Sequence, residues 1–426
     1  MINLNDIANV KLKHVEKPIE KSSLDYKKMS SSECSISWLQ LENENLSRYR
    51  QNQILAQLDQ WIPLVPSELT FDTLFIDIEK DVALLFIEYH EKLELFHQHS
   101  VVHPSDHTYC EADEFVNQLL NSMKKENSIQ KLQQQIDECR LWNKQVRSPL
   151  FFKLSSRSPK DVTRMNDKNV DDLFEQDLND HYTTELEKTN NSNRILSFTR
   201  AATKLLQVHS SNDVLELMLR STRVYQDLIE TYVDFWNESS PTKNKIALRE
   251  WDPTIDIRFE LRTFVVNSKL RACSQYNHVI YVEELEKYQF EIRALIHETI
   301  HYLQENFFKG VFTTYVADFV IYPKFFEKIQ REELGVDDVK ELSQRSCGEF
   351  IKLIELNPYE ESTGSCLFSW KEDAQPLPSH RDTSMTCQET NEDAFEYRFI
   401  TKQFAEEHLS QHLKKVVADE FKYILL

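Results

Sequence analysis

The sequence predicts an α+β protein that is predominantly helical, with one small sheet in its second half. The chain has 426 residues, of which 40% are hydrophobic and 11% aromatic, so it can fill the cores of two or three domains. It contains only 4 glycines. Because glycine serves tight turns, β-bulges and left-handed helix caps, this scarcity favours long helices over a β-rich fold.

The first half divides into a leader and a helical domain. Residues 1–35 are polar and rich in Lys and Ser, and we expect them to be flexible. The expected helical domain covers residues 36–245. Its apolar side chains recur with the helical period in five segments, which are 47–61, 72–97, 111–146, 193–208 and 211–238. Residues 153–192 carry mixed charges without such a period, which indicates a long loop or linker.

Residues 246–426 are expected to form a separate domain with a short sheet. Residues 257–266 alternate apolar with charged side chains, and residues 278–282 form a second β-branched and aromatic run. Both patterns are typical of strands. Residues 290–303 follow as a periodic apolar segment without Gly or Pro, which predicts a helix.

This predicted helix carries the motif His-Glu-x-x-His at His297, Glu298 and His301. Positions i and i+4 lie one turn apart on the same helical face, so both imidazoles can reach one metal ion while the carboxylate projects beside it. Zinc with three protein ligands lowers the pKa of its bound water to about 7. Glu298 could then act as the general base, which predicts hydrolysis by a zinc-bound hydroxide.

A short sheet followed by this motif resembles the zincin metallopeptidases. The metzincin pattern places a His or Asp at the position that Phe307 occupies here, so that subgroup is excluded. The segment 391–396, with sequence NEDAFE, is similar to the gluzincin motif Asn-Glu-x-x-x-Asp/Glu. This resemblance implies that Glu392 is the third zinc ligand and that Glu396 accepts the N–H of a zinc-bound imidazole.

Several alternatives stay open for the third ligand and for the oxyanion. Glu392 follows His301 by 91 positions, which is farther than gluzincins place this residue, and its acidic surroundings equally suit the first turn of a helix. Asp318, Glu389 and His380 are the other candidate ligands. Tyr397 or His380 could stabilise the oxyanion.

The leader carries a second resemblance. Residues 7–18, with sequence IANVKLKHVEKP, resemble the β-thymosin/WH2 actin-binding motif, in which a short amphipathic helix precedes a Leu-Lys-x-Val/Thr stretch. The resemblance implies that Leu4 and Ile7 bind the apolar cleft of actin, while Leu12 and Lys13 follow in extended form. An ordinary Lys-rich tail is the alternative.

Charge and cysteine usage limit the other partners. The formal net charge of −20 would repel both nucleic acid and anionic lipid. No apolar run approaches the length of a membrane span, and the first residues lack a signal-peptide core, so we expect a soluble protein. Seven cysteines without a CxxC pair argue against a disulfide framework and fit a reducing cytosol.

Two functions from different classes follow from these patterns. The first is a zinc endopeptidase, either an effector that a specialised secretion system delivers into a host cell, acting on actin or an actin-associated protein, or an ordinary cytoplasmic enzyme. The second is a non-catalytic actin- or cytoskeleton-binding protein whose metal site is vestigial or structural. Peptide turnover would distinguish them.

Overall fold

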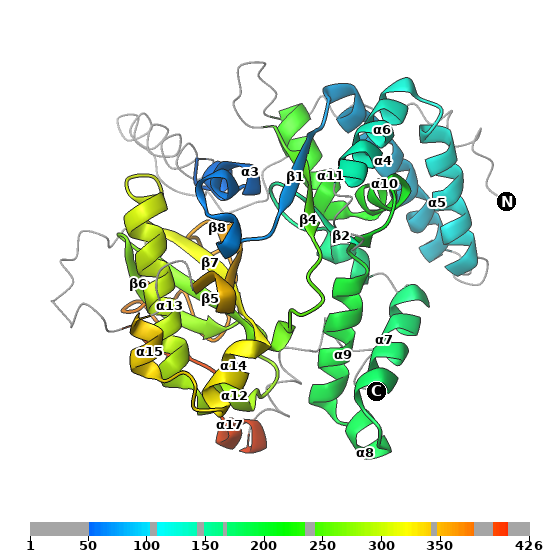
Figure 1. The fold of residues 1–426 in the computed structure, drawn as a ribbon. Helices are drawn as coiled ribbons and strands as arrows, with labels where there is room; N and C mark the ends of the chain where they lie inside the picture. The colour runs from blue at the N-terminus through cyan, green and yellow to red at the C-terminus, as the bar shows by residue number, and fades with distance from the viewer. Residues whose placement is uncertain are drawn as a thin grey trace, which may run out of the picture.

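The computed structural model describes residues 51–102, 109–142, 149–164, 168–234, 243–341, 347–378 and 395–407. It shows two lobes, each built on its own sheet (Figure 1). Helices make up most of the described elements, which confirms the predicted α+β class with predominant helix. Among the described residues, no helix combines the length and the apolar character needed to cross a membrane.

The first sheet has the strand order β1-β4-β2-β3. These strands are β1 (Thr73–Asp77), β2 (Leu150–Leu154), β3 (Gln207–Val208) and β4 (Lys245–Glu250). All its pairings are antiparallel, with Lys153 opposite Ala247 and Phe151 opposite Arg249. Because side chains alternate along a strand, β2 turns Phe152 toward one face of the sheet and Lys153 toward the other.

Helices cover one face of the first sheet. This helical layer consists of α4 (Lys80–Val102), α5 (Tyr109–Met123), α6 (Asn127–Trp142), α10 (Ser211–Arg220) and α11 (Thr222–Ile229). Phe152 and Leu248 pack against it in one buried core. A separate helical pair, α7 (Lys168–His181) and α9 (Asn191–Lys204), is joined through the short α8 (Glu185–Lys188) and packs through Phe174, Leu178 and Ala201. This pair stands beside the layer (Figure 1).

The second sheet has the order β8-β7-β5-β6-β9. Its strands are β5 (Glu260–Val266), β6 (Lys269–Gln275), β7 (Tyr315–Ile321), β8 (Ile351–Asn357) and β9 (Glu396–Arg398). The β9 strand pairs parallel with β6, and the other pairings are antiparallel.

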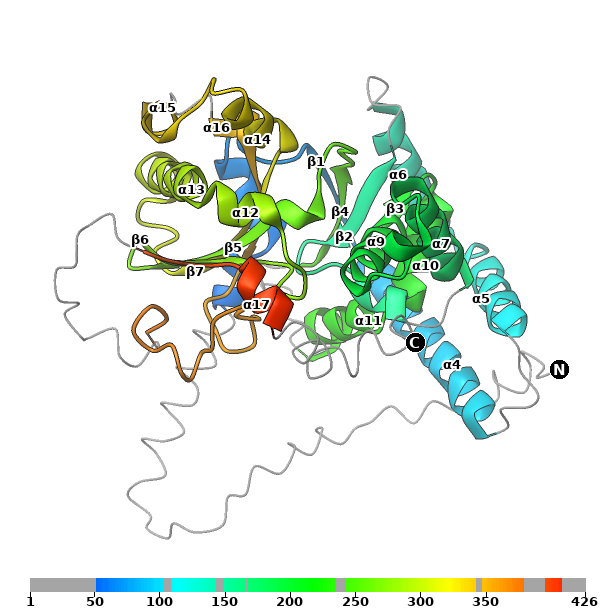
Figure 2. The same cartoon turned by 90° about the horizontal axis from the view of Figure 1, so that it is seen from below.

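The largest core lies on one face of the second sheet. There α13 (Gln289–Leu303) packs Ile296 and Ile300 against Leu261 and Phe319. The helices α12 (Glu283–Lys287), α14 (Pro323–Gln330), α15 (Val336–Glu341) and α16 (Cys347–Phe350) lie on the same side, as Figure 2 shows from below. Short helices from the beginning of the described chain, α3 (Leu58–Trp61) and η2 (Ser67–Leu69), also contribute Trp61 and Leu69 to this core.

Several predicted elements differ from the structure. The predicted helix 72–97 begins with a strand, because Leu74 and Ile76 pair with β4 before α4 starts at Lys80. The predicted linker 153–192 contains α7 and α8, and the predicted helix 111–146 is divided between α5 and α6. The region 36–245 therefore contains strands of the first sheet as well as helices, and β4 belongs to that sheet.

The second predicted strand also differs. Residues 278–282 form a turn and an unpaired extended stretch, and β6 is the partner of β5 instead. Val279 and Ile280 are still buried, because they pack into the core beneath α13. The side-chain amide of Gln275 donates to the carbonyls of Asn277 and Ile280 at 2.8 Å each, so these groups are satisfied without a strand partner.

A close backbone approach gives a first prediction. A Cβ at Gly348 in α16 would lie 2.5 Å from the backbone oxygen of Glu68 in η2. Gly348→Ala should therefore lower the free energy of unfolding by about 1–3 kcal/mol, measured by urea denaturation. Gly335→Ala is the matched control, because its Cβ would meet only the movable Asp338 carboxylate at 3.3 Å. Equal stability of the two variants would contradict this packing.

Candidate functional site

The His-Glu-x-x-His motif lies on α13, as predicted, but on the side of the helix that faces solvent. His297 and Glu298 side chains are each 30% exposed, and His301 is exposed. The two imidazole rings are parallel, with centroids 6.4 Å apart, and His297 Nδ1 lies 3.2 Å from Glu298 Oε1. The opposite face of α13 holds the buried Ile296 and Ile300. The motif therefore has the predicted helical geometry, on a partly exposed face of α13.

The candidate third ligand Asp318 lies on the other side of the second sheet. It projects from β7 and pairs with Arg262 of β5, whereas its neighbours Ala317 and Phe319 belong to the core beneath α13. Because alternate residues of a strand face opposite sides, Asp318 points away from the helix that carries the motif.

Two of the other predicted site residues contact neighbours on or next to β9, and the rest lie outside the described residues. Glu396 and Tyr397 lie on β9, where Glu396 accepts from Arg398 at 2.7 Å and the Tyr397 ring is tilted against the Phe399 ring, with centroids 5.2 Å apart. Burial raises the pKa of the Tyr397 phenol well above its usual value. The remaining predicted residues, which are Glu392, Glu389, His380, Leu4, Ile7, Leu12 and Lys13, lie outside the described residues. Within the described ranges, no three His, Cys, Asp or Glu side chains gather as a metal site. Zinc binding by His297 and His301 stays a prediction, and so does actin binding by the leader.

A different site forms where the two sheets meet. Arg262, Asp318 and Glu355 are direct neighbours across β5, β7 and β8, so they form one row on the face away from α13. From the first sheet, Lys153 and Arg249 point toward this row, because they lie on the face that the helical layer leaves uncovered. Glu260 lies two residues before Arg262 on β5, and the exposed Lys160 donates to Tyr276, whose ring lies under the Arg262 guanidinium. These seven side chains are called the charge cluster.

Hydrogen bonds join the two sheets within the charge cluster. Lys153 Nζ donates to Glu355 Oε1, and Arg249 Nη1 donates to the carbonyl of Ile354 at 2.6 Å. Arg262 donates from Nε and Nη2 to the two carboxylate oxygens of Asp318, each at 2.7 Å. Lys153 is 3% exposed and Asp318 is 4% exposed, so these charges are compensated by one another more than by water.

The pKa values of the cluster reflect this mutual compensation. Burial raises the pKa of the Glu355 carboxyl, but the ammonium groups of Lys153 and Lys160 outweigh it and bring that pKa to about 2. Burial also lowers the pKa of Lys153, which Glu355 only partly offsets. For Glu260, burial raises the pKa to about 7 although Lys160 opposes this. The pKa of each group in the cluster therefore depends on charges of the opposite sign, including charges from the other sheet.

Two further side chains, one amide and one thiol, lie beside the Arg262–Asp318 pair of the cluster. Asn357 lies two residues after Glu355 on β8, and its Nδ2 donates to Asp318 Oδ2 at 3.0 Å. Cys366, which follows β8 in a loop with a φ of 54°, lies close enough for the Arg262 guanidinium to oppose the rise in its thiol pKa that burial causes. Asp318, Glu355 and Asn357 bring oxygen atoms together, which are the ligands that Mg²⁺ and Ca²⁺ prefer.

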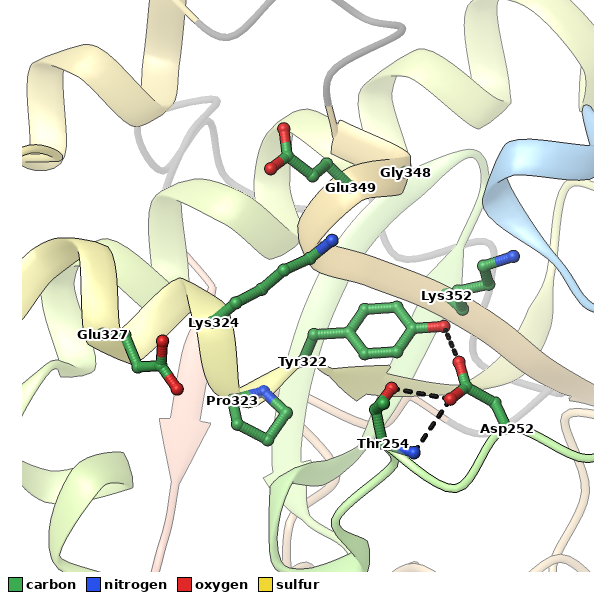
Figure 3. Close-up of a pocket in the computed structure, with 9 residues that line it drawn as sticks. All are labelled: Asp252, Thr254, Tyr322, Pro323, Lys324, Glu327, Gly348, Glu349 and Lys352. Atoms are coloured by element: carbon green, nitrogen blue, oxygen red, sulfur yellow. Dashed lines mark hydrogen bonds between the residues drawn. The ribbon is translucent and has the colours of Figure 1, made fainter.

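A hollow of about 440 Å³ lies between the start of α14, β8 and the chain that leaves β4 (Figure 3). Tyr322 Oη donates to Asp252 Oδ2 at 2.7 Å along its floor, and Lys352 Nζ donates to the carbonyl of Thr70 at 2.8 Å. Its lining mixes two lysines with three carboxylates, which indicates no single class of ligand.

Sequence reasoning missed the charge cluster, although two signals were present. Lys153 stands inside the apolar run LFFKL, where a buried lysine needs a charged partner. Glu355 and Asn357 alternate with apolar residues in the strand IKLIELN, so both must face one side. The partner of each lies far away in the sequence, which is why the pattern of either segment alone did not identify the site.

The family to which this chain is similar is not a zincin family. The D123 family model matches residues 197–422, which is more than half of the chain and includes the whole His-Glu-x-x-His helix. The zincin resemblance, the peptidase activity and the effector function built on them were therefore wrong, since this is not a zinc-metallopeptidase family.

Two solved structures are similar to this chain. Cdc123 from Schizosaccharomyces pombe has 18% identity and a TM-score of 0.45, and the match covers 83% of this chain and 98% of that chain. A C-terminally truncated form of the same protein has 19% identity and a TM-score of 0.45, with 82% of this chain and 98% of that chain covered.

The placement of the motif gives a second prediction. His301→Ala should change the free energy of unfolding by no more than about 0.5 kcal/mol, because the side chain lies on the solvent face of α13. Ile300→Ala, one position earlier, should lower it by about 2–5 kcal/mol, because this side chain is 3% exposed in the main core. Denaturant unfolding of both variants tests this orientation, and a larger loss for His301→Ala would contradict it.

Proposed function

Since the chain belongs to the D123 family, we propose that it is a binding protein and not a peptidase, and that its charge cluster holds a phosphate-bearing ligand together with a divalent cation. The observation that carries this proposal is the meeting of buried charges of both signs between the two sheets. The non-catalytic alternative from the sequence fits this proposal better than the peptidase does.

The charge balance of the cluster suits such a ligand. Four cations, which are Lys153, Lys160, Arg249 and Arg262, face three carboxylates, which are Glu260, Asp318 and Glu355. With all groups ionised, the cluster has a charge of +1, and protonation of Glu260, whose pKa is about 7, raises it toward +2. A phosphate chain with a bound divalent cation carries a small net negative charge, so it would complement the cluster without leaving an unpaired buried ion.

The chemistry of each group also fits. Arg262 offers a planar fork and Lys153 a compact ammonium, and both bind phosphate oxygens through charge-assisted hydrogen bonds. Asp318, Glu355 and Asn357 provide oxygen donors for the cation on adjacent strands. Existing ion pairs could exchange partners with the ligand, so binding would need little movement of the strands.

Calorimetric titration of the full chain gives a third prediction. ATP and inorganic pyrophosphate, each with Mg²⁺, should both bind, whereas adenosine should not, because the phosphates make the main contacts. Lys153→Met should weaken binding about tenfold or more, since a charge-assisted hydrogen bond contributes about 1.5–3 kcal/mol. Lys309→Met is the matched control, because Lys309 pairs with Glu305 on an exposed surface.

A further variant separates the cation from the phosphate. Asp318→Asn should weaken the binding of pyrophosphate with Mg²⁺ more than its binding without Mg²⁺, because the carboxylate would contact the cation. If neither phosphate compound binds the wild-type protein, or if Lys153→Met binds as the wild type does, the proposed site is wrong.

A further inference from the structure

The loop between β2 and α7 carries Lys160 from the first sheet to the second. It begins at Ser155, directly after β2, and reaches Lys160 at the start of η3 (Lys160–Arg164). Lys160 Nζ then donates to Tyr276 Oη of the second lobe at 3.4 Å. The Arg262 guanidinium of the charge cluster lies over the same Tyr276 ring, 4.9 Å from its centroid, and Lys160 Nζ lies 5.5 Å from that centroid. The position of this loop therefore determines how close Lys160 lies to the charge cluster.

Helix α11 binds residues 156 and 157, at the start of this loop, through the carboxylate of Asp227. Asp227, which is 6% exposed, accepts from Ser156 Oγ at 2.6 Å and from Arg157 Nε at 2.7 Å. Arg157 Nη2 also donates to the carbonyl of Arg223 and to Gln226 Oε1, at 3.3 and 3.2 Å. Arg157 therefore contacts three residues of the helix, and this limits how far the loop can move away from α11.

A second set of hydrogen bonds to α11 lies at the other end of the loop, next to Lys160. Asp161 accepts from Ser221 Oγ at 2.7 Å and from the backbone N–H of Arg223 at 3.0 Å, both at the N-terminus of α11. Ser221 is the N-cap of this helix, because its hydroxyl accepts from the backbone N–H of Val224. The carboxylate thus satisfies a backbone donor of α11 and interacts favourably with the helix dipole.

We propose that Asp161 and Asp227 are positioning residues for ligand binding, which fix residues 155–161 on α11 so that Lys160 is delivered to the phosphate-bearing ligand in the charge cluster. This inference rests on the proposed function, and it adds the helical layer of the first lobe to the elements that determine affinity. Neither carboxylate contacts the ligand. Each acts through the ammonium group of Lys160.

The test measures the dissociation constant of pyrophosphate with Mg²⁺ for Asp161→Ala, Asp161→Asn, Lys160→Met and the double variant Asp161→Ala/Lys160→Met. Asp161→Ala should weaken binding about tenfold, as expected for the loss of a well-placed charge-assisted contact. In the Lys160→Met background the same change should have no further effect, because the ammonium that it positions is gone. Asp161→Asn should restore part of the affinity, since its amide oxygen can still accept one of the two hydrogen bonds.

Asp213→Ala is the matched control for loss of a helix cap. Asp213 accepts from the backbone N–H groups of His209 and Ser210 in the capping box of the neighbouring α10, so its loss should lower stability comparably. It should leave the dissociation constant within twofold of the wild type, because α10 does not hold the loop. If Asp161→Ala unfolds the protein, Asp161→Asn with and without Lys160→Met provides the same comparison.

The outcomes separate the two proposals. If the wild type binds pyrophosphate and Asp161→Ala binds it equally well, or loses the same factor in the Lys160→Met background, the positioning role is wrong and the ligand site stands. If the wild type binds neither pyrophosphate nor ATP, the ligand site fails and the positioning role fails with it.

Discussion

The ion pair between Lys153 of β2 and Glu355 of β8 is the interaction on which the arrangement of the two lobes depends. Removing two charges from water costs several kcal/mol, and the cost is offset only when the partners meet with good geometry. Because the Lys153 side chain is only 3% exposed, moving the second sheet and its Glu355 carboxylate away would leave the lysine charge buried without a partner. The pair limits how far the lobes can separate or rotate.

Other contacts reinforce this constraint at the same boundary. Arg249 of β4 donates to the carbonyl of Ile354, and its guanidinium also lies over the Phe71 ring. Thr70 Oγ1 donates to the carbonyl of Leu353, so the segment before β1 is tied to β8 as well. The first sheet thus contributes apolar side chains to its own helical layer and polar side chains to the boundary. This division gives one protein both a stable core and a charged site.

The sequence predicted the parts of the structure that depend on local pattern. The helix at α13 and its amphipathic character followed from the spacing of Ile296, Ile300 and Leu303. The strand β5 followed from the alternation in residues 257–266, although residues 257–259 form a 3-10 turn before the strand begins. The peptidase activity inferred from His297, Glu298 and His301 was wrong, and the cause is physical. A catalytic metal-binding face and a polar surface face of a helix have the same spacing, so the spacing alone does not establish catalysis.

The charge cluster could not be predicted in the same way, because no short segment contains it. Lys153, Arg262, Asp318 and Glu355 come from four strands that are far apart in the sequence, and their proximity depends on sheet register. The strand β1 was also missed, since a short apolar run within 72–97 fits a helix as well as a strand until its pairing with β4 is known. The charge cluster and the strand β1 both depend on pairing between distant segments, which local sequence propensity does not reveal.

A double-mutant cycle on Lys153 and Glu355 tests most directly whether this ion pair links the lobes. The free energy of unfolding would be measured for Lys153→Met, Glu355→Leu and the double variant. Each single variant should lose about 3–5 kcal/mol, because the remaining charge is buried without its partner, and the double variant should lose much less than the sum. Losses that simply add would contradict the account, since they would mean that neither charge depends on the other.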